Sequence, residues 1–179
     1  MIVTLNTTQV LEYRRIAAGL KFLRSDCTVE LVDGIDVDAT DSQTLRRRYL
    51  QLLATAPPHL LPTADIADKI KLTTDSGFRA EATMPERCRR LVNIRLSSRQ
   101  RPAFPVNREQ YTAGGLHRKE LNPYSAPDNC EPVAVTEPDG TLTVIPAMRG
   151  AEVARAIAVI DPGDGTYILD ESLLDALVS

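Results

Sequence analysis

The feature of this 179-residue chain that most constrains its fold is a change of hydrophobic period at Ile66. Before this residue, apolar side chains recur at every third or fourth position, which places them on one face of a helix. After it, apolar and polar residues alternate, as they do in a strand with one buried face. Helices followed by strands are typical of an α+β fold. We therefore predict an α+β fold in which N-terminal helices pack on a mainly antiparallel β meander.

Two helices are predicted before the period changes. The first covers about residues 6–23, and Asn6 followed three positions later by Gln9 is a variant of the capping box at its start. The second covers about residues 42–55 and ends before Pro57, because proline lacks a backbone donor. The apolar residues expected to face inward are Val10, Tyr13, Ala17, Leu20 and Leu23 in the first helix, and Leu45, Tyr49, Leu52 and Leu53 in the second.

The strands are predicted to form hairpins. Alternating runs on both sides of Asp75-Ser76-Gly77 predict one hairpin, and residues 90–96 predict a third strand. Residues 131–147 predict a second hairpin, which turns at Pro138-Asp139-Gly140. Residues 154–160 predict a central strand, and "DPGDG" after it predicts a turn. The apolar face of the third strand is predicted to hold Val92, Ile94 and Leu96.

These elements are predicted to form a single domain of 179 residues. Residues 1–56 form its helical part, residues 66–96 and 131–160 form one sheet, and residues 170–178 form a short closing helix. Residues 97–130 show no sustained period and hold four prolines, so we predict a long irregular loop. Because such a loop must run over the surface, we expect it to be the least ordered segment and a principal contact with a partner.

The cysteine and histidine pattern argues against metal, cofactor and catalytic sites. Cys27, Cys88 and Cys130 are far apart and lack ligand spacing, so we predict three reduced thiols that bind no metal. The arginines around Cys88 could lower the pKa of its thiol, but neither His59 nor His117 is signalled as its base. Acidic residues at 33–41 lack the order of an EF-hand loop. We therefore predict no enzyme, no cofactor and no small-molecule substrate.

Basic residues concentrate in the middle of the chain. Ten Arg or Lys residues against three Glu lie between Arg79 and Lys119, and "LRRRY" adds three arginines on the polar side of the second helix. Clustered cations favour phosphate binding, but no nucleic-acid-binding motif accompanies them. Arginine is also enriched at protein–protein interfaces. Our candidate interface residues are Arg87, Arg89, Arg90, Arg99, Arg101, Phe104, Arg108, Tyr111 and Tyr124.

The N-terminus does not resemble a signal peptide, and no apolar run approaches the about 20 residues of a membrane span. We therefore expect a protein that has no membrane partner and is cytoplasmic when made.

Three segments resemble the head-to-tail connector (adaptor) proteins of tailed bacteriophages. "MPERCRRLV" after a hairpin is similar to their Leu-Pro-x-Asp-Cys segment, in which a strand ends and re-enters the sheet. "NPYSAPDNCEPVAVTEPDGTLTVIPA" is similar to their Asn-Pro-Tyr segment, proline-rich link and following hairpin. "YILDESLLDALV" is similar to the stretch that opens their last helix. The resemblance covers about residues 66–179.

The resemblance implies a non-enzymatic structural protein whose subunits form a ring between portal and tail. Its partners would be other copies of itself or other virion assembly proteins, and its final location the virion. Pro85 would then turn the sheet, and Arg87, Arg89 and Arg90 would present charge to neighbouring subunits. Two alternatives remain open: a non-viral interaction or regulatory domain with a basic face, with nucleic acid as a partner, and an uncharacterised enzyme.

Overall fold

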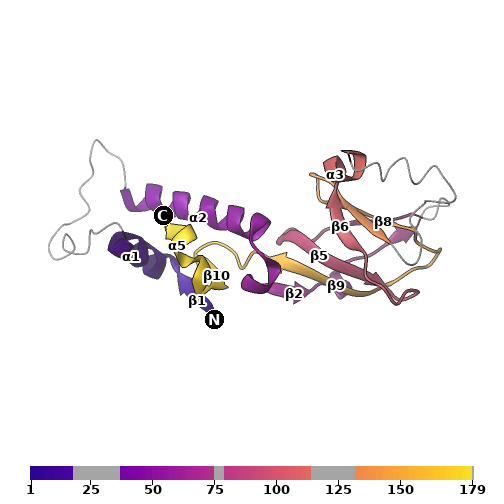
Figure 1. The fold of residues 1–179 in the computed structure, drawn as a ribbon, viewed down its shortest axis with the longest axis horizontal. Coiled ribbons are helices and arrows are strands. Elements are labelled where there is room, and N and C mark those ends of the chain that lie inside the picture. Colours follow the sequence, from indigo (N-terminus) through magenta and orange to yellow (C-terminus); the bar gives the residue numbers. More distant parts are fainter. Residues whose placement is uncertain (18–36, 75–78, 114–131, 179) are drawn as a thin grey trace. The chain divides into compact units, whose positions relative to one another are not determined.

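The computed structural model describes residues 1–17, 37–74, 79–113 and 132–178 (Figure 1). The fold is α+β, as predicted. Its contacts form two compact units: unit 1 comprises Met1–Pro62 and Ile160–Ser179, and unit 2 comprises Thr63–Val159. Our expectations of a single domain, and of N-terminal helices packed on the sheet of residues 66–160, therefore stay predictions.

Unit 1 is built on a two-stranded antiparallel sheet of β1 (Ile2–Asn6) and β10 (Thr166–Asp170), in which Ile2 lies opposite Asp170. We did not predict β1, although "IVTLN" is rich in the β-branched and apolar residues that strands favour. The helices of this unit are α1 (Thr7–Ala17), α2 (Val37–Thr55), η2 (Pro58–Leu60), η4 (Glu171–Leu173) and α5 (Leu174–Val178).

The core of unit 1 lies between α2 and β10. Leu45, Tyr49 and Leu53 of α2 are fully buried, which confirms three of the four inward residues, and Leu52 is half-buried. The prediction for α1 was wrong in part. Val10 is buried, but Tyr13 and Ala17 are exposed, and Leu20 and Leu23 lie outside the described residues.

The helix ends of unit 1 follow local rules. The predicted capping box is confirmed, since the Asn6 N–H donates to Gln9 Oε1 and the Gln9 N–H donates to Asn6 Oδ1, both at 2.9 Å. α2 ends at Thr55 before the two prolines, as predicted, but begins at Val37 rather than near residue 42. The closing helix is also confirmed, with Asp170 at its N-cap accepting from the Ser172 N–H at 3.1 Å.

Unit 2 contains two sheets rather than one. The two predicted hairpins do share a sheet, because β4 pairs with β8 in antiparallel register. However, the third strand and the strand near residues 154–160 belong to a second sheet of order β2-β9-β5, in which β9 is central. The five-stranded sheet has the order β3-β4-β8-β7-β6. The strands are β2 (Thr63–Asp65), β3 (Thr73–Thr74), β4 (Ala80–Thr83), β5 (Cys88–Leu96), β6 (Phe104–Asn107), β7 (Val133–Thr136), β8 (Thr141–Ile145) and β9 (Val153–Ile160).

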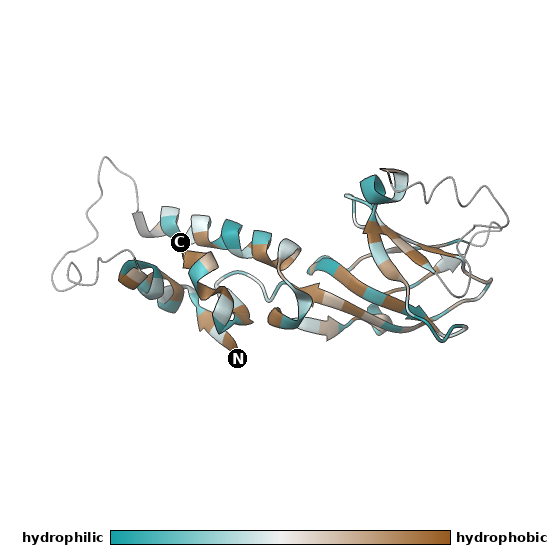
Figure 2. Cartoon of the chain, viewed as in Figure 1, coloured by the Kyte–Doolittle hydropathy of each residue, from teal (hydrophilic) through white to brown (hydrophobic). Residues whose placement is uncertain are grey.

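The faces of these strands agree with the alternation in most places. Hydrophobic and hydrophilic residues alternate along β5 in Figure 2. Ile94 and Leu96 of β5 are buried as predicted, but Val92 is half-buried and Leu91 is buried instead. The predicted turn at 138–140 is confirmed: Gly140 has φ +85°, and the Glu137 N–H donates to the Thr141 carbonyl oxygen at 2.8 Å. Positive φ is accessible to glycine without steric cost.

The prediction of a long irregular loop over residues 97–130 was wrong in the part that the structure describes. β6 follows Pro102 closely and pairs in parallel with β7, and α3 (Arg108–Ala113) follows β6 directly. A second capping box starts α3: the Asn107 N–H donates to Gln110 Oε1 at 3.2 Å, and the Gln110 N–H donates to Asn107 Oδ1 at 2.7 Å. Residues 114–130 lie outside the described residues. None of the helices within the described ranges combines the length and apolarity required to cross a bilayer.

Candidate functional site

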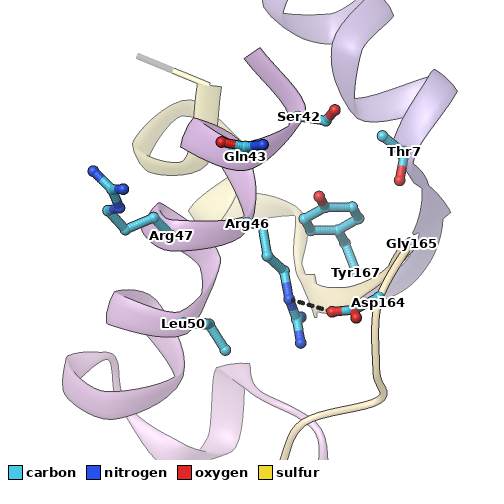
Figure 3. A pocket seen from close by; sticks show the side chains of 9 residues that line it. All are labelled: Thr7, Ser42, Gln43, Arg46, Arg47, Leu50, Asp164, Gly165 and Tyr167. Atoms are coloured by element: carbon cyan, nitrogen blue, oxygen red, sulfur yellow. Dashed lines mark ion pairs between the residues drawn. The ribbon is translucent and has the colours of Figure 1, made fainter. Parts of the chain in front are cut away.

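An open pocket of about 550 Å³ lies in unit 1, between α2, the start of α1 and the turn before β10 (Figure 3). Most residues of its lining are of polar types, and they include two neighbouring arginines. Figure 3 shows Arg46 pointing toward Asp164 and Arg47 pointing away from it. The lining residues are Thr7, Ser42, Gln43, Arg46, Arg47, Leu50, Asp164, Gly165 and Tyr167.

Arg46 connects α2 to the turn before β10. Its Nη2 donates to both carboxylate oxygens of Asp161, at 2.8 and 2.7 Å, and its Nε lies 3.2 Å from Asp164 Oδ1. Asp161 is only 3% exposed, and its Oδ1 also accepts the Gly163 N–H at 3.0 Å. A buried carboxylate needs such a partner. Two carboxylates therefore compensate the charge of Arg46, and the Arg46 side chain holds the turn in place.

A pair of tyrosines lies beneath Arg46. The rings of Tyr49 and Tyr167 meet edge to face with centroids 5.1 Å apart, and the Arg46 guanidinium carbon lies 5.8 Å from the Tyr49 ring. Burial raises the pKa of Tyr49 to about 12, so its hydroxyl is neutral at physiological pH. The hydroxyl donates to the Ile168 carbonyl oxygen at 2.9 Å and accepts the Ile168 N–H at 3.0 Å. Tyr49 therefore has a structural role at the edge of β10.

Sequence reasoning missed this arrangement. It identified the "LRRRY" arginines as a possible phosphate-binding group and "DPGDG" as a tight turn without further role. The turn is confirmed, but Asp161 within it is the buried partner of Arg46. The two residues are 115 positions apart, so no local pattern connects them.

The environment of Cys88 differs from the one that the neighbouring arginines indicated. Burial raises the pKa of the Cys88 thiol to about 11, so the thiol is protonated at neutral pH, whereas a catalytic cysteine needs its thiolate. Arg87 and Arg89 next to it are exposed. Cys88 is a free cysteine, while Cys27, Cys130 and His117 lie outside the described residues.

Acidic residues form no metal centre in the part of the chain that the structure describes. Within it, no three His, Cys, Asp or Glu side chains gather closely enough to hold a metal ion. Asp41, from the acidic stretch, instead pairs with Arg14 at 3.0 Å.

The candidate interface residues lie in different environments. The expectation that Arg99 and Tyr111 lie on the surface was wrong, since Arg99 is 9% exposed and Tyr111 is 2% exposed. Arg90 is half-buried, and burial lowers the pKa of both Arg90 and Arg99. Tyr124 lies outside the described residues. The exposed members are Arg87, Arg89, Arg101, Phe104 and Arg108.

The exposed arginines do not form one basic patch. Arg87 and Arg89 lie at the start of β5, whereas Arg101 follows its end. Eight steps of about 3.3 Å separate the two ends of this strand, or about 26 Å. Arg108 pairs with Glu137 and lies 5.7 Å from the ring of Tyr111, so it holds α3 against the sheet. It also lines a small cavity of about 230 Å³ together with Arg79, Glu81 and Tyr111.

The strand register brings the starts of β4, β6 and β7 and the end of β8 to one end of the five-stranded sheet. Phe104 of β6 lies opposite Val133 of β7, and Val133 lies opposite Ile145 of β8. Along the chain, Arg101 lies shortly before β6 and Arg79 lies directly before β4. Met148 and Arg149 lie shortly after β8. The strands from β6 to β4 span about 14 Å at about 4.8 Å per strand. We give the name sheet-end surface to the following exposed side chains, which lie within four residues of these strand ends along the chain: Arg79, Arg101, Phe104, Met148 and Arg149.

Comparison with protein-family models finds no match for this chain, and comparison with curated proteins finds none either. The geometry of the described residues therefore carries the functional argument.

Proposed function

We propose that the protein is a non-enzymatic structural subunit, similar to the head-to-tail connector proteins of tailed phages. It assembles with copies of itself or with other virion assembly proteins, and the sheet-end surface of unit 2 is its contact. The observation that carries the proposal is Phe104, which is 67% exposed at the start of β6. Large aromatic side chains flanked by arginine are typical centres of protein–protein interfaces.

Two further features support an assembly role. Met148, which follows the end of β8, is a second exposed apolar side chain of unit 2, and exposed apolar groups are frequent at interaction sites. Beside the pocket of unit 1, Arg46, Tyr49 and Asp161 hold the fold together. This structural use of polar groups supports an assembly role.

Sedimentation velocity over a concentration series tests the proposal. We expect the unmodified chain to form larger species as concentration rises. Phe104→Ala should weaken this association about thirtyfold, which corresponds to the about 2 kcal/mol of an interface hot spot. Thr83→Ala is the matched control, since Thr83 is exposed at the opposite end of β4 and should leave association unchanged.

Two results would contradict the proposal. One is a chain that stays monomeric at every concentration and captures no virion assembly protein. The other is association that Phe104→Ala does not weaken. Salt-sensitive binding of duplex DNA that is lost on replacing Arg87 and Arg89 would instead favour the alternative of a basic binding face.

A further inference from the structure

One edge of the small sheet in unit 1 carries backbone groups that point outward. The Glu171 N–H donates to the Met1 carbonyl oxygen and the Thr7 N–H donates to the Gly165 carbonyl oxygen, so odd-numbered residues of β1 bond to β10. In an antiparallel pair the bonded and non-bonded positions alternate. The N–H and C=O groups of Ile2 and Thr4 therefore point away from β10, and no described residue pairs with them.

The opposite edge of this sheet is covered at its middle residue. Ile168 is opposite Thr4, so its N–H and C=O point away from β1, and both bond to the Tyr49 hydroxyl at 3.0 and 2.9 Å. α2 thus satisfies the outward groups of Ile168, in the middle of β10, with one side chain. β1 has no equivalent cover among the residues that the structure describes.

Other outer strands carry features that discourage pairing with another chain. β6 contains Pro105, which has no N–H to donate. β2 has three residues and ends in Asp65, and β3 has only two residues. Charge, proline and short length are the usual protections of an edge strand. β1 has five residues, "IVTLN", with no charge, proline or glycine, and much of it is hydrophobic in Figure 2.

We infer that the outer edge of β1 pairs antiparallel with β1 of a second copy of this chain. With Val3 opposite Val3 of the other copy, each Ile2 lies opposite Thr4. The outward groups then face each other and form four hydrogen bonds around a two-fold axis. The pairing joins the two small sheets into one sheet of four strands, and it covers Ile2, which is 50% exposed.

The chemistry of β1 favours a copy of itself as the occupant. The strand is uncharged, so two copies meet without repulsion between like charges, and its β-branched side chains suit cross-strand pairs. Two five-residue strands bury less than the about 1,200 Å² of a stable interface. The contact therefore adds to the assembly that we propose for the sheet-end surface. The inference rests on that proposed function, because the pairing needs several copies of the chain.

Cross-linking tests the register. In a background without Cys27, Cys88 and Cys130, Val3→Cys should form a disulfide between copies under mild oxidation. A non-hydrogen-bonded pair has Cα atoms about 4.5 Å apart, within the range of a disulfide. Thr4→Cys is the matched control, because two Thr4 residues would be offset along the strands by about 7 Å, which with the strand spacing of about 4.8 Å puts their Cα atoms beyond disulfide reach. Covalent dimer with Val3→Cys and monomer with Thr4→Cys is the expected result.

An edge-blocking variant tests the contact without cross-linking. Thr4→Pro removes an outward N–H and leaves the bonds of β1 to β10 intact, so it should weaken self-association about tenfold or more. Circular dichroism checks that the fold is kept, and Thr4→Val should associate normally.

The inference is overturned if Val3→Cys stays monomeric under oxidation, if Thr4→Cys cross-links equally well, or if Thr4→Pro associates like the unmodified chain. It is also overturned if β1 pairs only with a strand of a different protein. Association that still depends on Phe104 in those cases would leave the proposed function standing.

Discussion

The two units use their arginines differently. In unit 1, Arg46 is 19% exposed and holds the buried carboxylate of Asp161. In unit 2, Arg108 is 54% exposed and pairs with Glu137 near the surface, while Arg87, Arg89 and Arg101 are exposed. A charge pair removed from water becomes essential to the element that buries it, whereas an exposed pair contributes little. The difference between the units is therefore one of burial: the Arg46–Asp161 pair is removed from water, whereas the named arginines of unit 2 are exposed to it.

The largest expected effect is a difference in the stability that is lost on replacing Arg46 and on replacing Arg108. Arg46→Ala leaves Asp161 buried without its cation and should lower the free energy of unfolding of unit 1 by about 3 kcal/mol or more. Arg108→Ala should lower that of unit 2 by less than about 1 kcal/mol. Hydrogen exchange of amides in β1 and β10, compared with amides in β4 and β8, measures the two effects separately.

Arg47→Ala is the control for the first variant, since Arg47 is the exposed neighbour of Arg46 on the same helix. If Arg46→Ala and Arg108→Ala cost the same, the comparison between the units fails.

An intermediate effect is expected for the tyrosine at the edge of β10. Tyr49→Phe keeps the ring contact with Tyr167 but removes the hydroxyl partner of both backbone groups of Ile168. Unsatisfied buried polar groups cost about 1–3 kcal/mol, so we expect a loss of about 2 kcal/mol from unit 1, measured by denaturant unfolding. Tyr13→Phe on exposed α1 should change nothing. If Tyr49→Phe leaves the free energy of unfolding unchanged, water replaces the hydroxyl as the partner of Ile168.

The smallest effects concern alkaline pH. Burial raises the pKa of Cys88 in unit 2 from 9.0 to about 11, and that of Tyr49 in unit 1 from 10.0 to about 12. The folded state holds both protons more tightly than the unfolded state. The contribution of the protonated Cys88 thiol to the free energy of unfolding is therefore complete below pH 9 and is lost as the pH rises through 11. The contribution of the Tyr49 hydroxyl is complete below pH 10 and is lost as the pH rises through 12.

Hydrogen exchange as a function of pH should show unit 2 weakening first. Cys88→Ala should remove the part of this loss that begins near pH 9 and leave the response of unit 1 unchanged. A simultaneous loss in both units that Cys88→Ala does not alter would contradict the assignment.

The two capping boxes show how far local signals reach. Asn6 with Gln9 was predicted from the sequence as a capping box, and it starts α1. Asn107 with Gln110 is the same signal and starts α3, but the prolines around it led us to predict a loop. The signal was sufficient in both places, since each box depends on hydrogen bonds between residues three positions apart. α3 could therefore have been predicted.

The candidate site shows where local signals end. Phe104 and Arg101 were named from the sequence and are exposed, but Tyr111 and Arg99 were named on the same grounds and are buried. Their burial depends on α3 packing on the sheet and on the chain that follows β5. Composition cannot distinguish a surface arginine from a buried one when both lie in a segment without period.

The sequence by itself determined the α+β class, the turn at 138–140, the two capping boxes and the end of α2 before its prolines. The class follows from the hydrophobic period of whole segments, and each of the other features depends on residues within about four positions, whose conformational preferences are intrinsic. Only the tertiary structure decided that β5 and β9 leave the five-stranded sheet, that Asp161 needs Arg46, and that β1 has an open edge. These features arise from pairings between residues far apart in the chain, because burial and hydrogen bonding of one segment depend on which distant segment packs against it.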